Sequence, residues 1–264
     1  MMKVRGFAVC MMSLLAGLLF TGAGAFADDP IQVLFLSKSS GFEHSVIHRE
    51  KGELGHAEKI MLELGAKNNM KVVVTKDAGM INADQLKTFD VVMFYTTGDL
   101  TKPSKDNGTP MSEDAVAELY DWVKGGGAFC GMHTAADTFH DNEAYRKLSG
   151  GVFKTHGKQE VAKLTVAKEH PITAHLGDSI TLMDEWYIFR DVTDTYTPLL
   201  MIETKGMEQD LYNSIDPYPI TWIEEVGKGR IFNTALGHRE DVWTNPDFQK
   251  LLVNGIQWAA KKLD

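Results

Sequence analysis

Short apolar runs alternate with helical patterns through the first half of the chain. Residues 31–39, IQVLFLSKS, form a β-branched and aromatic run that is typical of strands buried on both faces. Residues 71–75 and 90–97 repeat this pattern, and residues 46–68 between the first two runs carry apolar side chains at helical spacing. This alternation predicts parallel strands joined by helical crossovers.

A further helix and strand continue the series. Apolar side chains at Val116, Leu119 and Val123 predict a helix with one buried face, which the glycines at 125–127 end. Residues 128–132, AFCGM, predict the fourth strand. We expect the next helix to begin directly after this strand, in the segment HTAAD.

The second half is richer in strands than in helices. Strand patterns follow in close succession at residues 160–168, 180–192, 198–204 and 219–237, and the last of these contains a hairpin turn at VGKGR. A final helix is predicted over residues 246–262. The fold class is therefore α/β: a doubly wound, mostly parallel, flavodoxin-like sheet with added strands in the C-terminal half.

The first 27 residues have the pattern of a secretory signal peptide. Lys3 and Arg5 precede an apolar run at residues 7–20, and Ala25-Phe26-Ala27 forms an A-x-A cleavage site. We expect cleavage after Ala27, a periplasmic or secreted protein, and a single domain over residues 28–264. An uncleaved membrane anchor is the alternative, although the apolar run is short for a span.

Charge and cysteine content narrow the classes of partner. The net charge of −9 becomes −11 once Lys3 and Arg5 are removed, and no basic run is present. Binding to nucleic acid or to an anionic membrane is therefore not expected. No segment after the signal peptide is apolar enough for membrane insertion. Removal of the signal peptide would leave Cys130 as the one cysteine, so the exported chain could form no internal disulfide.

Polar residues follow several of the predicted strands. His44 comes after the first strand, Asp99 after the third, and His133 and Asp137 after the fourth. Ligands of parallel sheets bind beyond the carboxyl ends of the strands, so these side chains are candidates for a site. The alternative for His133 is a structural hydrogen bond to a neighbouring loop, and for His44 it is a solvated position beside a helix cap.

Six motifs in order give the sequence a family resemblance: LSKSSGFEHSVI, YTTGDL, GGGAFCGMHTAAD, GGVFKTHG, DEWYIFRD and TALGHRED. Together they resemble the ThuA-like, or trehalose-utilisation, family, over roughly Ile31 to Ala260. The resemblance implies a class I glutamine amidotransferase-like fold and a link to the metabolism of trehalose and 3-keto-glycosides. Carried over motif by motif, it points to His44, His133, Asp137, His156, Glu185 and His238. Gly157 stands where the family often has proline, which leaves the shape of that loop open.

Glutamine amidotransferases of this fold carry a nucleophilic cysteine at the strand-to-helix corner. Here His133 occupies the corner, and Cys130 lies three residues earlier, inside the predicted strand. A thiolate must stand at the corner to attack a carbonyl, so we do not expect a glutamine amidotransferase.

The six positions suggest acid/base chemistry. We expect His133, His44, His238, Asp137 and Glu185 to be catalytic, with His44 or His238 as the base and His133 stabilising negative charge. Histidines with a carboxylate also hold divalent metals, and His156, His238 and Glu185 are candidate ligands. Their spacing matches no compact metal motif, so only the fold can bring them together.

The function predicted is cleavage or isomerisation of a glycoside or 3-keto-glycoside of the trehalose type, with a small carbohydrate as substrate and a divalent metal as a candidate cofactor. Two alternatives stay open. One is a non-catalytic module that binds a carbohydrate or another partner in the same pocket. The other is a divalent-metal hydrolase that acts on a substrate other than a sugar.

Overall fold

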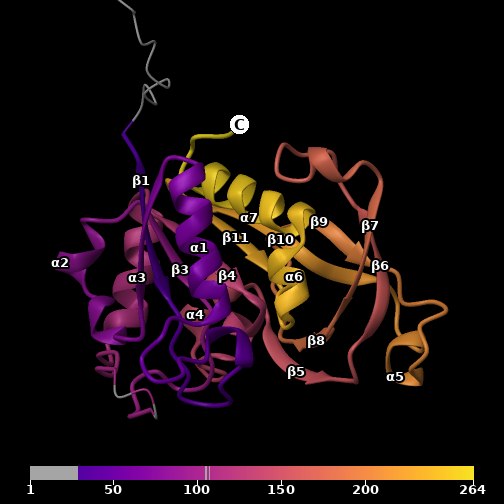
Figure 1. Ribbon diagram of the computed structural model, residues 1–264, viewed down its shortest axis with the longest axis horizontal. Helices are drawn as coiled ribbons and strands as arrows, with labels where there is room; N and C mark the ends of the chain where they lie inside the picture. The colour runs from indigo at the N-terminus through magenta and orange to yellow at the C-terminus, as the bar shows by residue number, and fades with distance from the viewer. Residues whose placement is uncertain (1–28, 105, 107) are drawn as a thin grey trace, which may run out of the picture.

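Five parallel strands form one half of a nine-stranded sheet in the computed structural model, which describes residues 29–104, 106 and 108–264 (Figure 1). In spatial order they are β2 (Met70–Thr75), β1 (Ile31–Leu36), β3 (Val91–Phe94), β4 (Ala128–Met132) and β11 (Gly229–Thr234). The parallel pairing confirms the predicted sheet. The expected signal peptide lies outside the described residues.

The other half of the sheet is antiparallel, which confirms the added C-terminal strands. It continues from β11 through β10 (Tyr218–Val226), β9 (Thr197–Ile202), β6 (Glu160–Val166) and β7 (Ser179–Asp184). Two further strands, β5 (Val152–His156) and β8 (Tyr187–Arg190), pair only with each other. In Figure 1 this pair lies at the lower edge, where the parallel strands end.

Helices cover both faces of the parallel half. One face carries α1 (His56–Lys67), α6 (Glu240–Thr244) and α7 (Pro246–Ala259), and the other carries α2 (Ala83–Leu86), α3 (Ala115–Gly125) and α4 (Glu143–Ser149) (Figure 1). The remaining short helices are η1 (Ser45–Ile47), η2 (Ala78–Met80), η3 (His133–Asp137), η4 (Ala174–Leu176) and α5 (Asp210–Asn213). No helix among the described residues is long and apolar enough to cross a bilayer.

The alternation of side chains along β1 shows why its apolar run is unbroken. Val33 and Phe35 belong to the hydrophobic core under α1, α6 and α7, whereas Leu34 and Leu36 belong to the core under α2, α3 and α4. Both sets are fully buried. A strand covered on both faces needs apolar residues at successive positions, as the sequence pattern indicated.

The helix predicted over residues 46–68 is wrong in its first half. Only η1 forms there, and α1 begins at His56 after a turn in which Gly52 has a φ of +84°. Gly55 packs against the backbone of Ile47, where a Cβ would lie 2.8 Å from the nearest atom. Its N–H donates to the Glu58 carboxylate at 2.8 Å, which caps α1 at this point.

The long helix predicted after the fourth strand is also wrong. His133 begins η3, a five-residue 3-10 turn, and α4 starts ten residues later at Glu143. Phe139 between them has a φ of +49°, which no α-helix accommodates. The corner therefore has no α-helical N-terminus behind it.

The strand predicted over residues 180–192 divides into two strands of different sheets. β7 ends at Asp184 in the large sheet, and β8 begins at Tyr187 in the two-stranded sheet. Glu185 and Trp186 form the break. This change of direction places the carboxylate of Glu185 beside His133 and His238.

Candidate functional site: a histidine–glutamate cluster at the carboxyl edge of the sheet

His133 stands at the corner after β4 with a positive φ of 36°, a strained conformation for a residue with a side chain. Its ring is anchored from behind, because Nδ1 lies 2.8 Å from the backbone oxygen of Ala235, which follows β11. A carbonyl can only accept, so Nδ1 carries the proton and donates it. The other nitrogen, Nε2, faces His238 and Glu185, and in the neutral imidazole it is the atom that carries the lone pair.

Four residues from distant segments meet in front of this nitrogen: His44, His133, Glu185 and His238. One ligand atom from each lies within 4.8 Å of those of the other three. Three of the atoms form a closer triangle, with His133 Nε2 3.3 Å from His238 Nδ1, and Glu185 Oε2 3.2 Å from His238 Nδ1 and 3.6 Å from His133 Nε2. The structure thus brings together four of the six positions that the sequence singled out.

A buried carboxylate holds two of these residues in place. Asp184, at the end of β7, accepts the backbone N–H of Gly237 at 2.8 Å and that of Glu185 at 3.0 Å. The first of these backbone groups directly precedes His238, and the second belongs to Glu185 itself. Asp184 therefore ties the break in the antiparallel half to the loop after β11 in the parallel half.

The cluster combines a neutral imidazole with an ionised carboxylate. Burial, followed by the neighbouring imidazoles of His133 and His238, lowers the pKa of His44 to about 2, so this ring is neutral. Burial also acts to raise the pKa of Glu185, but His133 and His238 outweigh it and hold that pKa well below its usual range. The set consists of a neutral imidazole, an ionised carboxylate and two further imidazoles.

The donor set fits a divalent transition metal. Zinc binds imidazole nitrogen and carboxylate oxygen at about 2.0–2.2 Å, so the edges of a tetrahedral site measure about 3.3–3.6 Å. The three sides of the triangle, 3.2, 3.3 and 3.6 Å, lie within about 0.1 Å of this range. One further observation points the same way: the Ala235 carbonyl accepts the Nδ1 proton of His133 and so fixes the ring, as hydrogen-bond partners behind metal-binding histidines usually do.

His156 lies beside this group rather than within it. Its Nδ1 is 3.2 Å from Glu185 Oε1, the oxygen that does not belong to the triangle. The side chain is 41 % exposed, compared with 19 % for His238 and complete burial for His133. His156 therefore stands on the solvent side of the cluster, where a bound molecule could reach it.

Aromatic rings line the cluster. The ring centroid of Tyr187 lies 4.3 Å from that of His133, and Phe153 lies 4.3 Å from Tyr187 on the paired strand β5. Phe42, 67 % exposed, meets the ring of His44 edge to face at 4.9 Å. The cluster thus has a buried aromatic wall on one side and an exposed ring near its other end.

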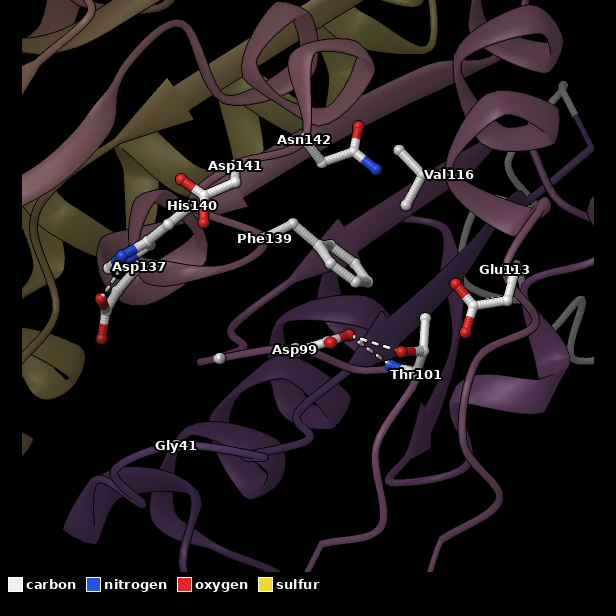
Figure 2. A pocket seen from close by; sticks show the side chains of 11 residues that line it. Gly41, Asp99, Thr101, Glu113, Val116, Asp137, Phe139, His140, Asp141 and Asn142 are labelled. Carbon is white, nitrogen blue, oxygen red and sulfur yellow. Dashed lines mark hydrogen bonds and ion pairs between the residues drawn. The ribbon is translucent and has the colours of Figure 1, made fainter.

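A pocket of 520 Å³ adjoins the turns that carry His44 and His133, and its lining is rich in carboxylate and amide groups (Figure 2). The residues that line it are Gly41, Gly98, Asp99, Thr101, Glu113, Val116, Asp137, Phe139, His140, Asp141 and Asn142. Figure 2 shows the pair formed by Asp137 and His140 at one end of the pocket and Glu113 at the other, with Phe139 between them.

Asp137 belongs to this pocket and not to the cluster. Its Oδ1 lies 2.6 Å from Nε2 of His140. Burial raises the pKa of Asp137, against the hydrogen bond from His140 and the charges of His140, His133 and His156, which lower it. His140 lies outside the six positions that the sequence singled out, and only its i,i+3 spacing from Asp137 could have suggested the pair.

Cys130 lies inside β4, three residues before the corner, and is fully buried. Burial raises the pKa of its thiol. A buried, protonated thiol is a poor nucleophile, so the position of Cys130 favours a role in the core.

Fold and site together define an α/β protein with a histidine–glutamate cluster at the carboxyl edge of its parallel strands. The chain belongs to the ThuA family, described as trehalose utilisation, which matches residues 32–259. No curated protein matches the sequence.

Solved structures share the fold at low identity. A ThuA-like protein from Bacteroides uniformis superposes with a TM-score of 0.68 at 19% identity, covering 91% of this chain and 96% of that one. A ThuA-like protein from Parabacteroides merdae gives a TM-score of 0.69 at 17% identity, covering 89% and 92%. A β-galactosidase from Bacillus circulans gives 0.52 at 11% identity, covering 87% of this chain but 31% of that one. At these identities the likeness shows the fold alone.

Proposed function

We propose that the protein is a metal-dependent enzyme that acts on a neutral, polyhydroxylated substrate of the 3-keto-glycoside class. The observation that carries the proposal is the triangle of His133 Nε2, His238 Nδ1 and Glu185 Oε2, with edges of 3.2–3.6 Å, in which the tautomer of His133 is fixed by the Ala235 carbonyl. His44 supplies a fourth donor.

A bound divalent cation supplies Lewis acidity, which stabilises negative charge on a ketone oxygen. The chain's own groups supply the proton transfers. His44, His133 and His238 point their nitrogens into the cluster, so the base is better assigned to His156 than to His44 or His238. His156 is exposed and lies 3.2 Å from the ionised Glu185. In this position it can accept the proton from the carbon beside a substrate ketone.

Cleavage then needs an acid. When the proton leaves the carbon next to the ketone, the electron pair can expel the glycosidic oxygen from the following carbon, and that oxygen requires a proton. Asp137, whose pKa is raised by burial, and its partner His140 face the adjoining pocket and can donate one. Return of the proton to a neighbouring carbon, without expulsion, would be isomerisation.

The character of the adjoining pocket supports a carbohydrate as substrate. Asp99, Glu113 and Asp141 offer carboxylate oxygens, and Asn142 an amide, which suit sugar hydroxyl groups. The same carboxylates disfavour a phosphorylated or otherwise anionic substrate. The trehalose-utilisation family supports a disaccharide of the trehalose type, and the signal-peptide pattern at residues 1–27 supports an exported enzyme.

The test combines metal analysis with turnover. The purified protein should contain close to one equivalent of a divalent transition metal by mass spectrometry and should cleave or isomerise 3-keto-trehalose. Removal of the metal with a chelator should abolish turnover, and its return should restore it. Glu185→Gln should lose both metal and turnover.

His175→Gln is the matched control, because His175 lies at η4 and contacts the backbone of α7 instead of the cluster. This variant should keep both properties. If the purified protein contains no metal and chelation does not change its turnover, the metal site is refuted. The four residues would then form only a hydrogen-bonded network. Tight binding of the sugar without turnover would instead support a carbohydrate-binding module, and turnover restricted to other compounds would support a non-sugar hydrolase.

A further inference from the structure

A buried hydroxyl joins the loop after His156 to the break that contains Glu185. Gly157, the residue after His156, donates its N–H to Tyr212 Oη at 2.6 Å. The same hydroxyl donates its proton to the backbone oxygen of Trp186, the residue after Glu185, at 2.9 Å. Tyr212 belongs to α5 and is fully buried. A phenol from a third segment thus connects the neighbours of the base and of the carboxylate beside it.

Gly157 in turn fixes the ring of His156. Nδ1 of the ring lies 2.8 Å from the backbone oxygen of Gly157 and 3.2 Å from Glu185 Oε1. A carbonyl and an ionised carboxylate can only accept, so Nδ1 carries the proton. In the neutral ring Nε2 is then the nitrogen that can accept a proton from a substrate. The orientation of the base therefore depends on where the Gly157 oxygen lies.

The peptide unit that holds this oxygen is itself clamped. Its N–H, which belongs to Lys158, donates to Gln209 Oε1 at 2.7 Å, and Gln209 Nε2 donates to the Lys158 oxygen at 2.7 Å. A Cβ on Gly157 would lie 2.5 Å from Gln209 Oε1 and 2.9 Å from Tyr212 Cε2. The loop thus lies directly against these two side chains, with no room for a side chain at position 157.

We propose that Tyr212 is a positioning residue for the reaction: its hydroxyl holds His156 and Glu185 in register, so that the base and the carboxylate act as a pair. The catalytic consequence rests on the proposed function. Glu185 is also held by Asp184, which accepts its N–H at 3.0 Å. Loss of the hydroxyl should therefore release His156 while the four metal-binding positions stay in place.

The experiment compares Tyr212→Phe with the wild-type protein on 3-keto-trehalose. Phenylalanine keeps the ring and removes both hydrogen bonds. We expect kcat to fall by about 10–100-fold, because a misplaced catalytic group costs a rate of this order. KM should change by less than about threefold, and the metal content should equal that of wild type. The melting temperature should fall by about 3–8 °C, because two buried hydrogen bonds are lost.

Asn254→Leu is the matched control for this loss of stability. Asn254 is also buried, and its Nδ2 donates to the backbone oxygens of Pro171 and Ile172, each at 3.2 Å. These bonds join α7 to the loop before η4. The control should lower the melting temperature by a similar amount and keep the wild-type kcat.

A second variant reaches the same loop from the other side. Gly157→Ala places a methyl group against Gln209 and Tyr212, so the loop must move away from both. It should reproduce the loss of kcat, with the metal retained, and it tests the proposal if Tyr212→Phe does not fold.

A spectroscopic measurement is independent of turnover. The ¹⁵N shifts of the His156 imidazole, assigned with His156→Gln, are recorded for the zinc-loaded protein at a pH above the ordinary histidine pKa. The wild-type ring should be the tautomer protonated at Nδ1, and Tyr212→Phe should give a mixture of both tautomers.

The outcomes separate this proposal from the proposed function. A wild-type kcat in Tyr212→Phe would overturn the positioning role, as would a loss of kcat that comes with loss of the metal or that Asn254→Leu matches. If the wild-type protein does not act on the sugar, the proposed function fails. The tautomer then decides the structural part, and an unchanged His156 signal in Tyr212→Phe would overturn it as well.

Discussion

The two halves of the sheet deliver their residues to the cluster in different ways. The parallel half contributes His44, His133 and His238, each from the segment that follows the carboxyl end of a strand: β1, β4 and β11. The antiparallel half contributes Glu185, from a break between two strands that join different sheets. Parallel strands converge by topology, whereas an antiparallel meander brings a residue to the same edge only by leaving its own sheet. The positions of the three imidazoles thus follow from the order of the parallel strands. The position of the Glu185 carboxylate depends on the break between β7 and β8.

The largest effect should come from removing one residue from each half. His133→Ala and Glu185→Gln should each lower kcat/KM for the 3-keto substrate by about 10²–10⁴-fold. The double variant should lose no more than the worse single variant, because both act on one cluster. Steady-state kinetics with circular dichroism as a fold control test this, and multiplicative losses would show that the halves act independently.

A smaller effect is expected at Asp184, the link between the halves. Asp184→Asn should lower metal affinity and turnover by about 10–100-fold, as is usual for groups that orient ligands. The amide can keep one of the two backbone contacts, to Gly237 or to Glu185, so the fold should persist. Metal titration monitored by calorimetry measures the change. Asp178→Asn, in the loop before β7, is the control and should behave as wild type.

A substitution in the parallel half, at Glu58 and away from the cluster, should change the stability of the fold. Burial acts to raise the pKa of Glu58, but Arg49, Ser37 and Gly55 bond to its carboxylate and hold that pKa below its usual value. Because the folded pKa is depressed, the ionised form stabilises the fold above the unfolded value of about 4.5, and this stabilisation is lost as pH falls through the folded pKa.

Glu58→Gln should therefore lower the free energy of unfolding at pH 7 by about 1–3 kcal/mol. Denaturant melts should show that its difference from wild type shrinks below pH 4.5. Glu63→Gln, on the exposed side of α1, is the control and should change stability by less than about 0.5 kcal/mol. A difference that is constant with pH would contradict the assignment.

The smallest effect is expected at Phe42, the exposed ring beside His44. If it packs against the substrate, Phe42→Ala should raise KM by about threefold to tenfold and leave kcat nearly unchanged. Leu211→Ala, at another exposed apolar position, should alter neither constant. A fall in kcat at constant KM would place Phe42 in the chemistry instead of in binding.

Much of the parallel half could be predicted from the sequence. Unbroken apolar runs identify strands covered on both faces, and Val33 and Leu34, which enter different cores, show why. Once the strands are parallel, their ends share an edge, so the meeting of His44, His133 and His238 follows from topology. The family motifs pointed to the same three positions and to Glu185.

The remaining features are decided by contacts that no local pattern records. Residues 180–192 have the pattern of a single strand, yet the chain changes sheets at Glu185, where the Asp184 carboxylate is hydrogen-bonded to the backbone of Gly237, 53 positions away. Likewise, the pair of Asp137 and His140 depends on the turn at Phe139, whose positive φ the sequence does not announce. Periodicity describes which face is buried but not where a strand stops.

The carbonyl of Ala235 makes the orientation of the His133 ring depend on the alignment of two strands. It lies one residue beyond β11, whose Thr234 is paired with Met132, the neighbour of His133. A slip of β11 by one residue would move that oxygen by about 3.3 Å. The imidazole would then be free to turn and present its protonated nitrogen to the centre. A substitution that weakens the pairing of β4 with β11, even far from the pocket, would therefore leave a folded protein in which the His133 ring is misoriented.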